Sequence, residues 1–423
     1  MNYTQGIRRN WRQFALQLFV VFAVGLTIGS ERTVVPVLGR DVLGVESLLV
    51  IGSFVVSFGF VKAILNLYGG KWAEEFGRRR VLIAGWLVAL PIPFVLIYAP
   101  NWWWITGANV LLGVNQGLTW SMSVNAKIDL AGSEARGLAV GLDEAFGYGG
   151  VAVGSWVTGV VAARYGLRPE PFYGLLGVVI LAGLVSVLFV EETLPYARAE
   201  SDGNETDADL SFSEVVKRAT YGDQTLFAAA QAGSVEKFVD VLVWIAFPLY
   251  LSASGLGVAH IGLVVGVYGG VWGVLQLWTG RLADKIGRRP PVVAGMFVAG
   301  AGVLATTLVS GFSSWVVTAG VTGVGMALLY PNLITVIGDA AHPSWRATGL
   351  GVYRMWRDAG YGFGAVVIGI TADVFSIHDA FYVTAYAMFI SGVIVLVSMR
   401  ETHPTLGEYE RPRTAERNSV SDE

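Results

Sequence analysis

Cysteine is absent from the 423-residue chain, and charged residues make up only 14% of it. The lack of cysteine excludes disulfides, thiol nucleophiles and thiolate metal sites, and it leaves the redox compartment undetermined. Soluble domains contain about a quarter charged residues, so an ordinary cytosolic enzyme is disfavoured. What is present instead is 54% hydrophobic residues and a mean hydropathy of +0.57, which is typical of a chain that lies largely in lipid.

Apolar stretches of about 20 residues, the length that crosses a bilayer as a helix, recur along the chain. Short breaks rich in glycine, proline or charge separate them. The pattern predicts an all-α integral membrane protein with twelve transmembrane helices, at 14–38, 48–68, 79–98, 104–124, 137–162, 170–190, 225–251, 258–279, 291–310, 314–337, 348–371 and 380–399.

A polar gap divides these spans into two groups of six, which predicts an N-terminal unit at 1–191 and a C-terminal unit at 223–400. The intervening linker, 192–222, is acidic and lacks lysine and arginine from 200 to 213. We expect the linker to be solvated and the polar tail, 401–423, to be disordered, and we assign neither a site.

Lysine and arginine outside the spans gather at both termini and in alternate loops. This positive-inside distribution predicts a multi-pass protein of the cell (plasma) membrane with both termini in the cytoplasm. The expected partners are the lipid bilayer, a small-molecule substrate, and protons or another coupling ion. We expect a monomer that binds no nucleic acid.

Internal repetition is the most informative feature of the sequence. The segment 70–78 follows the second span, and its counterpart 280–288 follows the eighth, 210 residues later. Two further pairs keep this offset: Asp129 with Asp339 and Arg136 with Arg346. Matches at one constant offset across several loops indicate two homologous six-helix halves.

The repeated loop contains a glycine, three residues, an acid, a basic residue, any residue, a glycine and then basic residues. It resembles the signature loop of the major facilitator superfamily, and the resemblance covers nearly the whole chain. It implies two pseudo-symmetric six-helix bundles around a central cavity that opens alternately to each side of the membrane. One departure is Glu75, which stands where the pattern has a basic residue and predicts a weaker first copy.

In this family fold, the loops are expected to latch a cytoplasmic gate. Glu74 and Asp284 can accept hydrogen bonds from a neighbouring helix N-terminus, and Arg78 and Arg288 can reach a carboxylate. The alternative is that the arginines serve topology alone. The expected gate residues are Gly70, Glu74, Gly77, Arg78, Asp129, Arg136, Gly280, Asp284, Gly287, Arg288, Asp339 and Arg346.

Ionisable residues within spans cost roughly 2.5–3.5 kcal/mol each on insertion scales, so they indicate a transport site or an ion pair. Glu236 and Asp240 lie near the middle of a span and share a helix face, where two carboxylates repel unless one is protonated or a cation lies between them. We hypothesise a proton-coupling or substrate site formed by Glu236, Lys237 and Asp240. The alternative is a static pair of a carboxylate with Lys237 or with an arginine of another helix. The remaining candidates are Asp143, Glu144, Arg354, Arg357, Asp358, Glu31 and Arg32.

Arg357 and Asp358 suit either an anionic substrate group or an ion pair with Lys62. Lys62 and Arg354 lie close enough to the inner helix ends for snorkelling to explain them. In the fourth span, amide side chains either bind substrate in the cavity or tie helices together: these are Asn109, Asn115 and Gln116.

Drug-efflux members of the family carry an arginine three residues before a Gln-Gly pair in span 4 and a Gly-Pro element in span 5. This chain keeps Gln116-Gly117 but has Gly113 at the arginine position, and Tyr148 follows Gly147 where proline is expected. Both departures weaken an antiporter interpretation.

Enzyme chemistry finds little support in the sequence. The glycine run 266–273 lacks the Lys-Ser/Thr of a phosphate loop and is embedded in a span, so helix packing explains it. The four histidines show no metal-ligand spacing. We expect no enzyme activity, no cofactor and no metal.

The leading hypothesis is therefore a secondary transporter of the efflux type, which exchanges protons for a small organic compound. A second is a proton- or ion-coupled uptake symporter for an organic anion held by Arg357 or Lys237. A third is a membrane sensor that kept the fold and lost transport.

Overall fold

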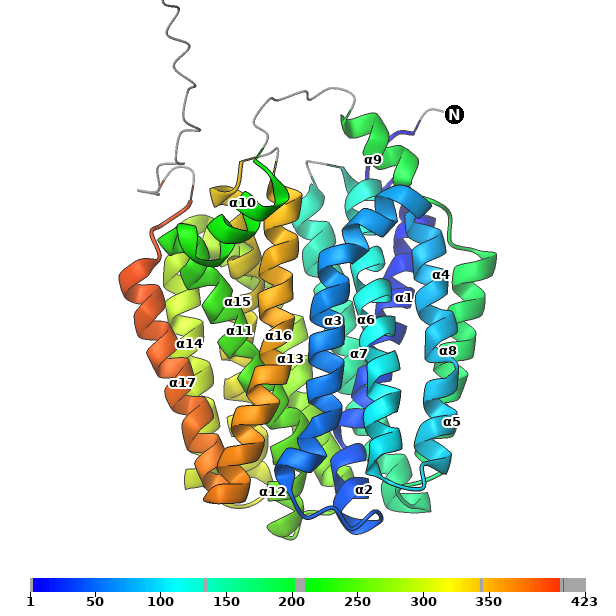
Figure 1. Cartoon of the computed structure of the whole chain (residues 1–423), viewed down its shortest axis with the longest axis vertical. Coiled ribbons are helices and arrows are strands. Elements are labelled where there is room, and N and C mark those ends of the chain that lie inside the picture. The colour runs from blue at the N-terminus through cyan, green and yellow to red at the C-terminus, as the bar shows by residue number, and fades with distance from the viewer. Residues whose placement is uncertain (1–2, 133–134, 202–209, 343–344, 404–405, 407–423) are drawn as a thin grey trace, which may run out of the picture.

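The computed structural model describes residues 3–132, 135–201, 210–342, 345–403 and 406, and this part of the chain forms an all-helical bundle of long helices that run side by side (Figure 1). The first half contains α1 (Trp11–Arg32), α2 (Val35–Asp41), α3 (Leu48–Phe76), α4 (Arg78–Ala89), α5 (Pro91–Tyr98), α6 (Trp102–Ala131), α7 (Arg136–Tyr165), α8 (Glu170–Leu188) and α9 (Leu194–Ser201). The second half contains α10 (Phe212–Lys217), η2 (Arg218–Gly222), α11 (Gln224–Val241), η3 (Leu242–Ala246), α12 (Phe247–Ala253), α13 (Val258–Ile286), α14 (Arg289–Leu308), α15 (Phe312–Ala340), α16 (Arg346–Val374) and α17 (Ile377–Ser398).

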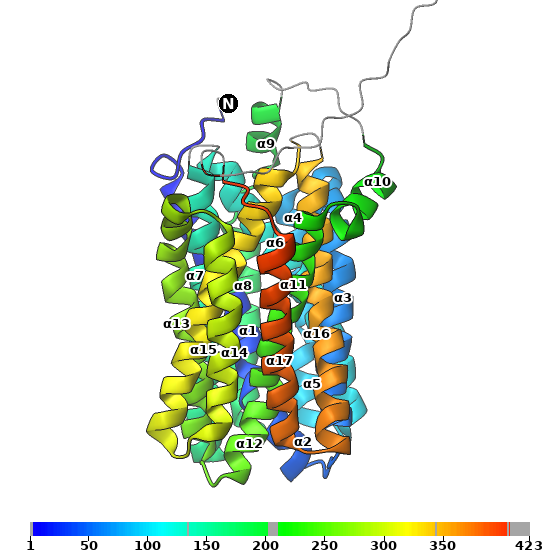
Figure 2. The ribbon, with the colours of Figure 1, turned by 90° about the vertical axis from the view of Figure 1, so that its left-hand side faces the viewer.

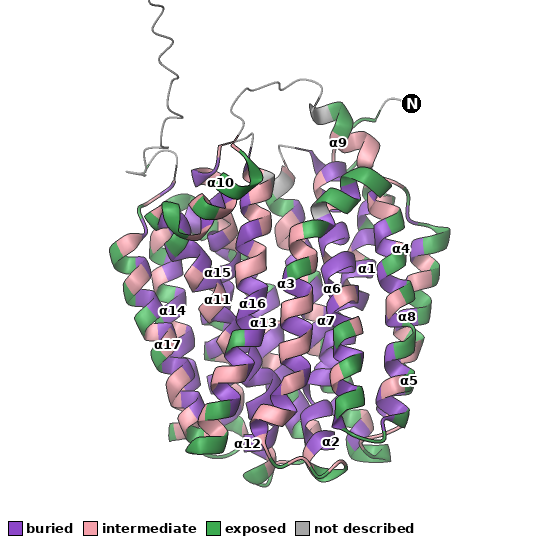
Figure 3. Ribbon diagram, viewed as in Figure 1, coloured by how far each residue is buried: buried purple, intermediate pink, exposed green. Residues whose placement is uncertain are grey.

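The outer surface of the bundle is apolar. Leu188 of α8 is 65% exposed and Val397 of α17 is 78% exposed, whereas the buried residues gather in the centre of the bundle (Figure 3). Nine helical segments of the described chain are long and apolar enough to cross a membrane: α1–α2, α3, α4–α5, α7, α8, α13, α14, α15 and α17. A bundle that exposes apolar side chains and keeps its backbone in helices is suited to lipid. The protein is a multi-pass membrane protein.

The other three expected spans, 104–124, 225–251 and 348–371, fall on helices of a different composition. They correspond to α6, to α11 with η3 and α12, and to α16. These helices carry much of the buried charge and amide of the protein, including Lys127, Asp240 and Arg357. Their lower hydropathy follows from facing a polar interior, so we interpret them as the helices that build the site.

The first described residues and the end of α17 lie at the same end of the bundle, called here the terminal end. In Figure 2 the N-terminus and the last residues of α17 are at the top, and α2 and α12 lie at the opposite, far end. Within the bundle α1 packs on α7, α7 on α13 of the second half, and α3 on α16 of the second half. The two halves therefore meet along α7–α13 and α3–α16.

Glycines let the helices of these contacts approach closely. A methyl group added to Gly150 of α7 would clash with the carbonyl oxygen of Phe22 on α1. One added to Gly266 of α13 would lie 3.1 Å from the carbonyl oxygen of Ala152 on α7. The glycine run 266–273 thus packs a helix against its neighbour, as the sequence indicates.

The far end of the bundle is closed. Every residue from Val241 to Tyr250 is buried, and so is the start of α2 from Val35 to Leu38. Asp373, at the end of α16, caps α3 of the other half: its carboxylate accepts hydrogen bonds from Ser47 Oγ at 2.5 Å and from the backbone N of Leu48 at 2.6 Å. This contact joins the two halves at the far end.

The linker and the start of the tail are more ordered than the sequence suggests. Helix α9 packs on α6 of the first half, whereas α10 and η2 pack on α16 of the second half, where Trp356 Nε1 donates to Thr220 Oγ1 at 3.0 Å. Val215 of α10 is 1% exposed. The expectation of a fully solvated linker was wrong here because α10 is amphipathic and has a capping box at Ser211, which is typical of a docked helix. Residues 202–209, 404–405 and 407–423, which contain the rest of the expected solvated segments, lie outside the described residues.

Candidate transport site

The middle of the bundle holds a dense group of ionisable side chains that are at most 7% exposed: Glu31, Arg32, Lys62, Lys127, Asp143, Glu144, Glu236, Lys237, Asp240, Arg357 and Asp358. They come from α1, α3, α6, α7, α11 and α16, that is, from both halves. Buried charge is stable only when it is paired and hydrogen-bonded, so the pairing decides what each group can do.

Asp240 of α11 is a fully engaged carboxylate. Arg32 of α1 binds it at 2.5 Å, and Tyr361 and Tyr268 donate their hydroxyls at 2.5 and 3.3 Å. Lys237 Nζ lies 3.4 Å from its second oxygen. Four donors around one carboxylate stabilise its ionised form, and the Arg32 contact ties the first half to the second.

Glu236 is held in a similar way. Arg357 of α16 binds Glu236 Oε1 at 3.1 Å, and Lys237 lies 3.3 Å from the same oxygen. The Tyr148 hydroxyl of α7 contacts both cations, at 3.3 Å from Arg357 and 3.4 Å from Lys237. The sequence left two ways to relieve the repulsion between Glu236 and Asp240: a proton on one carboxyl, or a cation between them. In the structure a cation, Lys237, lies between the two carboxylates.

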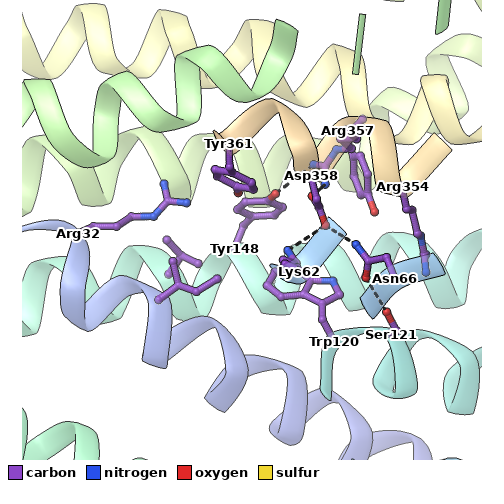
Figure 4. A pocket seen from close by; sticks show the side chains of 13 residues that line it. Arg32, Lys62, Asn66, Trp120, Ser121, Tyr148, Arg354, Arg357, Asp358 and Tyr361 are labelled. Atoms are coloured by element: carbon purple, nitrogen blue, oxygen red, sulfur yellow. Dashed lines mark hydrogen bonds and ion pairs between the residues drawn. The ribbon is translucent and has the colours of Figure 1, made fainter. Parts of the chain in front are cut away.

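Lys62 of α3 points into the bundle and pairs with Asp358 of α16 at 3.4 Å (Figure 4). Asn66 donates to the same carboxylate at 2.5 Å, and Ser121 of α6 in turn donates to Asn66 at 3.1 Å. The snorkelling explanation was therefore wrong for Lys62, because a buried partner carboxylate on the adjacent helix draws the ammonium inward. Arg354 is half-buried and forms no ion pair within the described chain.

Two carboxyls differ from the other four of this buried group because no cation lies within ion-pair distance of them in the described chain. Glu31 of α1 accepts a hydrogen bond from Asn109 Nδ2 of α6 at 2.9 Å, and its other oxygen has no protein partner there. Glu144 of α7 accepts one from Trp120 Nε1 of α6 at 3.2 Å. Both are almost fully buried. An ionised carboxylate in this setting has no directly bonded cation, so each is a candidate for holding a proton.

Asp143 has a cation partner that sequence reasoning missed. Lys127 binds it at 2.7 Å, and both side chains are completely buried. Ser123 accepts from Lys127 at 2.5 Å and donates to Asp143 at 3.2 Å. The expected span ended at 124, but α6 continues to Ala131, which brings Lys127 inside the bundle. One feature of the sequence pointed to a buried Lys127: Ser123 and Lys127 are four residues apart and therefore share a helix face.

The amide side chains of α6 tie helices together. Asn115 donates to the carbonyl of Gly85 on α4 at 3.0 Å, and Gln116 donates to Thr27 of α1 at 2.8 Å. Neither lines the cavity described next, so the structure assigns both to helix packing. Asn109 instead holds Glu31.

A narrow cavity of about 20 Å³, which is room for about one water molecule, lies between the halves (Figure 4). Its walls carry four cations, one carboxylate, four aromatic rings, two small polar side chains and two aliphatic ones: Arg32, Lys62, Arg354, Arg357; Asp358; Trp120, Tyr148, Tyr330, Tyr361; Asn66, Ser121; Ile28, Val151. Helices α6, α7 and α15 contribute the rings of Trp120, Tyr148 and Tyr330, which the sequence analysis did not assign to a cavity. Aromatic and charged side chains contributed by both halves are typical of the lining of a site for a small organic molecule, and such a molecule needs a wider opening than this structure has.

The repeated loops form two matching clusters at the terminal end. Arg78 Nε lies 3.0 Å from Asp129, and Arg288 Nε lies 3.2 Å from Asp339, so both expected contacts are present, each within one half. Arg288 also binds Asp284 at 2.6 Å. Among the described residues, Glu74, which is exposed on α3, forms no ion pair that corresponds to the one between Asp284 and Arg288. The weaker first copy stays a prediction.

The carboxylates that cap the following helices come from elsewhere in the chain. Glu192 accepts from the backbone N of Arg78 at 2.8 Å, and Glu401 accepts from that of Arg288 at 2.8 Å. The expectation that Glu74 and Asp284 do this was wrong, since Glu74 faces outward and Asp284 binds the Arg288 side chain. Glu192-Thr193 and Glu401-Thr402 are a repeated pair that the sequence offered as a signal.

Glycines end the first helix of each cluster. Gly77 and Gly287 have φ angles of 91° and 94°, which L-residues rarely adopt. Gly70 and Gly280 lie earlier, within α3 and α13. Arg346 begins α16 and is half-buried, and Arg136 begins α7, its side chain outside the described structure.

The fold and this charged cavity define a membrane transporter built from two related halves. Comparison with known families agrees: the model described as Major Facilitator Superfamily matches residues 18–235 and again 227–419. The chain belongs to the major facilitator superfamily.

Relatives within the family extend over nearly the whole chain. Multidrug resistance protein MdtG of Enterobacter lignolyticus is 24% identical over 95% of this chain and 96% of its own length. The class E tetracycline resistance protein of Escherichia coli is 23% identical over 72% of this chain and 74% of its own length. Among solved structures, a POT family transporter in complex with a thioalcohol-conjugated peptide superposes with a TM-score of 0.71 at 12% identity, covering 91% of this chain and 96% of that one. The latter likeness shows the fold alone.

Proposed function

We propose that the protein is a secondary active transporter that exports a small organic solute in exchange for protons. In this proposal twelve helices form two six-helix bundles, with α6, α11–α12 and α16 added to the nine apolar segments. Both termini lie in the cytoplasm of the cell, which fits their shared position at one end of the bundle and the basic loops there. The names of the multidrug and tetracycline resistance relatives support export.

The observation that carries proton coupling is the pair of buried carboxyls without a cation, Glu31 and Glu144. Each can hold a proton in the closed core and release it when the halves separate and water reaches it. Both contact α6, through Asn109 and Trp120, and Trp120 lines the cavity. In this proposal, Trp120 links the protonation of Glu144 to the solute in the cavity. Asp240 is the weaker candidate, because four donors stabilise its charge.

Alternating access requires contacts between the halves that can break. Arg32 with Asp240, Lys62 with Asp358, and the Asp373 cap on α3 all join the two halves. In the proposed mechanism they hold the far end closed, and they separate when that end opens. The clusters at Arg78 and Arg288 are the proposed cytoplasmic gate and would engage the opposite half when the terminal end closes.

The test is proton flux in liposomes that contain the purified protein, with an internal pH dye and a panel of lipophilic cations, neutral compounds and organic acids. Glu31→Gln and Glu144→Gln are expected to abolish substrate-driven proton movement, whereas the exposed Glu75→Gln is the matched control and keeps it. Loss of coupling only in Glu236→Gln or Asp240→Asn would move the coupling site to α11 and contradict the assignment.

A second function, uptake of an organic anion together with protons, is favoured by one observation: four cations and a single carboxylate line the cavity. The direction of proton movement distinguishes export in exchange for protons from uptake together with protons. Protons that move opposite to the solute support export by exchange, and protons that accompany the solute support uptake. No flux with any compound would favour the third hypothesis, a sensor that does not transport.

A further inference from the structure

We propose that the substrate class of the cavity is an amphipathic organic anion, whose acidic group binds Arg354 and whose planar apolar body lies against the aromatic wall. The inference rests on the proposed function only in taking this cavity as the transport site. It does not depend on the direction of transport or on the coupling ion.

The first step is the charge of the cavity wall. Three of its four cations already have carboxylate partners: Arg32 binds Asp240, Lys62 binds Asp358, and Arg357 binds Glu236. These partners occupy the guanidinium and ammonium groups in the closed core. A solute charge that competed for them would have to break buried ion pairs, which costs several kcal/mol each.

Arg354 is different. It lines the same cavity, it is half-buried, and it forms neither an ion pair nor a side-chain hydrogen bond within the described chain. It lies eight residues into α16, roughly 12 Å from the start of that helix, so it is some way from the terminal end. Figure 4 shows Arg354 at one edge of the cavity, on the side of Asn66 and Ser121. A guanidinium in this position offers a planar fork of donors that suits a carboxylate, sulfonate or phosphate group.

The second step is the acidic surroundings of Arg354. Asp143 and Glu144 of α7 lie near enough to interact with it electrostatically, but Asp143 pairs with Lys127 and Glu144 bonds to Trp120. Neither carboxylate therefore neutralises the guanidinium directly. An incoming acid would supply the contact that the protein itself leaves open.

The third step is the aromatic wall. The rings of Trp120, Tyr148 and Tyr330 line the same cavity as Arg354, and Arg357 already stacks on Tyr330 at 3.7 Å from the ring centre. Flat apolar groups pack well on such rings, and polar groups at the edge then fix their orientation. The sequence alternatives Arg357 and Lys237 are less suited as anchors, because the first is bound by Glu236 and the second lies outside the cavity lining.

The experiment measures equilibrium binding to the purified protein with no proton gradient. Three probes share one two-ring body: 2-naphthoate, its neutral amide, and a trimethylammonium analogue. We expect naphthoate to bind at least tenfold more tightly than the other two. A charge-assisted hydrogen bond of this kind corresponds to about a tenfold to hundredfold change, which is the loss expected for Arg354→Gln. Arg354→Lys keeps the positive charge but loses the planar fork of donors. Its affinity for naphthoate is expected to lie between that of the wild type and that of Arg354→Gln.

The matched control is Arg164→Gln, an exposed arginine at the far end of α7. It should leave naphthoate binding unchanged, and thermal unfolding of each variant checks that it is folded. Equal binding of acid and amide, preference for the cation, no naphthoate binding, or full binding by Arg354→Gln would each overturn the proposal. If a cation drives proton flux while naphthoate does not bind, the substrate class is wrong and the transport function stands. If naphthoate binds while no compound drives flux, the substrate class stands and the transport function is wrong.

Discussion

The Asp373 cap on α3 provides a direct test of the conformational cycle. Its carboxylate accepts from Ser47 Oγ at 2.5 Å and from the backbone N of Leu48 and Leu49 at 2.6 and 3.1 Å. Asp373 belongs to the second half, and all three donors belong to the first. Asp373→Asn removes the charge and one acceptor oxygen, so it weakens the contact only where the far end is closed.

The free energy that Asp373→Asn removes from the closed far end follows from the number of these hydrogen bonds and from their exposure to solvent. A hydrogen bond to a charged group contributes about 1.5–3 kcal/mol, and a carboxylate at a helix N-terminus adds about 0.3–1 kcal/mol. Because Asp373 is exposed and asparagine keeps one acceptor, we expect a net loss of about 1–2 kcal/mol. At about 1.4 kcal/mol per factor of ten, this shifts the ratio of closed to open far ends by about five- to thirtyfold.

The assay is the distance between spin labels across the far end. The chain has no cysteine, so the pair Tyr98→Cys and Leu308→Cys introduces the only thiols. Tyr98 ends α5 in the first half and Leu308 ends α14 in the second, and both are more than 70% exposed. Asp373→Asn is expected to raise the population with the longer distance.

A matched control exists at the same end of the bundle. Asp379 accepts from Ser376 Oγ at 2.5 Å within α17 and its cap, in one half only. Asp379→Asn makes the same chemical change and should leave the distance distribution as it was. If Asp373→Asn gives the same distribution as the control, the cap does not hold the halves together and the reasoning fails.

Further predictions concern packing and stability. Lys127→Met leaves Asp143 buried without a cation and should lower the free energy of unfolding by about 3–5 kcal/mol. The double variant with Asp143→Asn should recover much of this loss. If the melting shifts of the two single variants simply add in the double variant, the pair is not coupled. Gly150→Ala should lower the yield of folded protein because its methyl group meets a backbone oxygen, whereas Gly149→Ala has open space and should be tolerated; equal yields would refute this. Glu401→Gln should lower the melting temperature by weakening the cap of α14, an effect worth about 1 kcal/mol, and an unchanged melting curve would contradict it.

The sequence was most informative where contacts are local or repeated. The offset of 210 residues located Arg78 with Asp129 and Arg288 with Asp339, because each pair sits in a loop cluster that recurs in both halves. The all-helical fold and the membrane location follow from runs of apolar residues, which depend on composition alone. Family membership, indicated by the loop, is confirmed by the comparison across both halves.

Pairing inside the core was beyond sequence reasoning. Arg32 and Asp240 are 208 residues apart, and their contact depends on how α1 and α11 rotate about their axes when the halves meet. Helical spacing tells which residues share a face but not which face meets which helix. For the same reason Glu236 and Asp240 looked like the best proton carriers, whereas Glu31 and Glu144 are the buried carboxyls that form no ion pair in the described part of the chain.

The positions of the ionic contacts along the bundle explain which state this structure represents. Contacts that join the halves, Arg32 with Asp240 and the Asp373 cap, lie at the centre and the far end, and the far end is lined with buried residues. At the terminal end, Arg78 and Arg288 each bind a carboxylate of their own half. Arg354, on the terminal-end side of the cavity, is half-buried, while Arg32, deeper in, is 1% exposed. In the proposed topology, with the basic loops in the cytoplasm, we interpret this arrangement as that of an inward-facing transporter, in which a solute reaches Arg354 before any buried pair has to break.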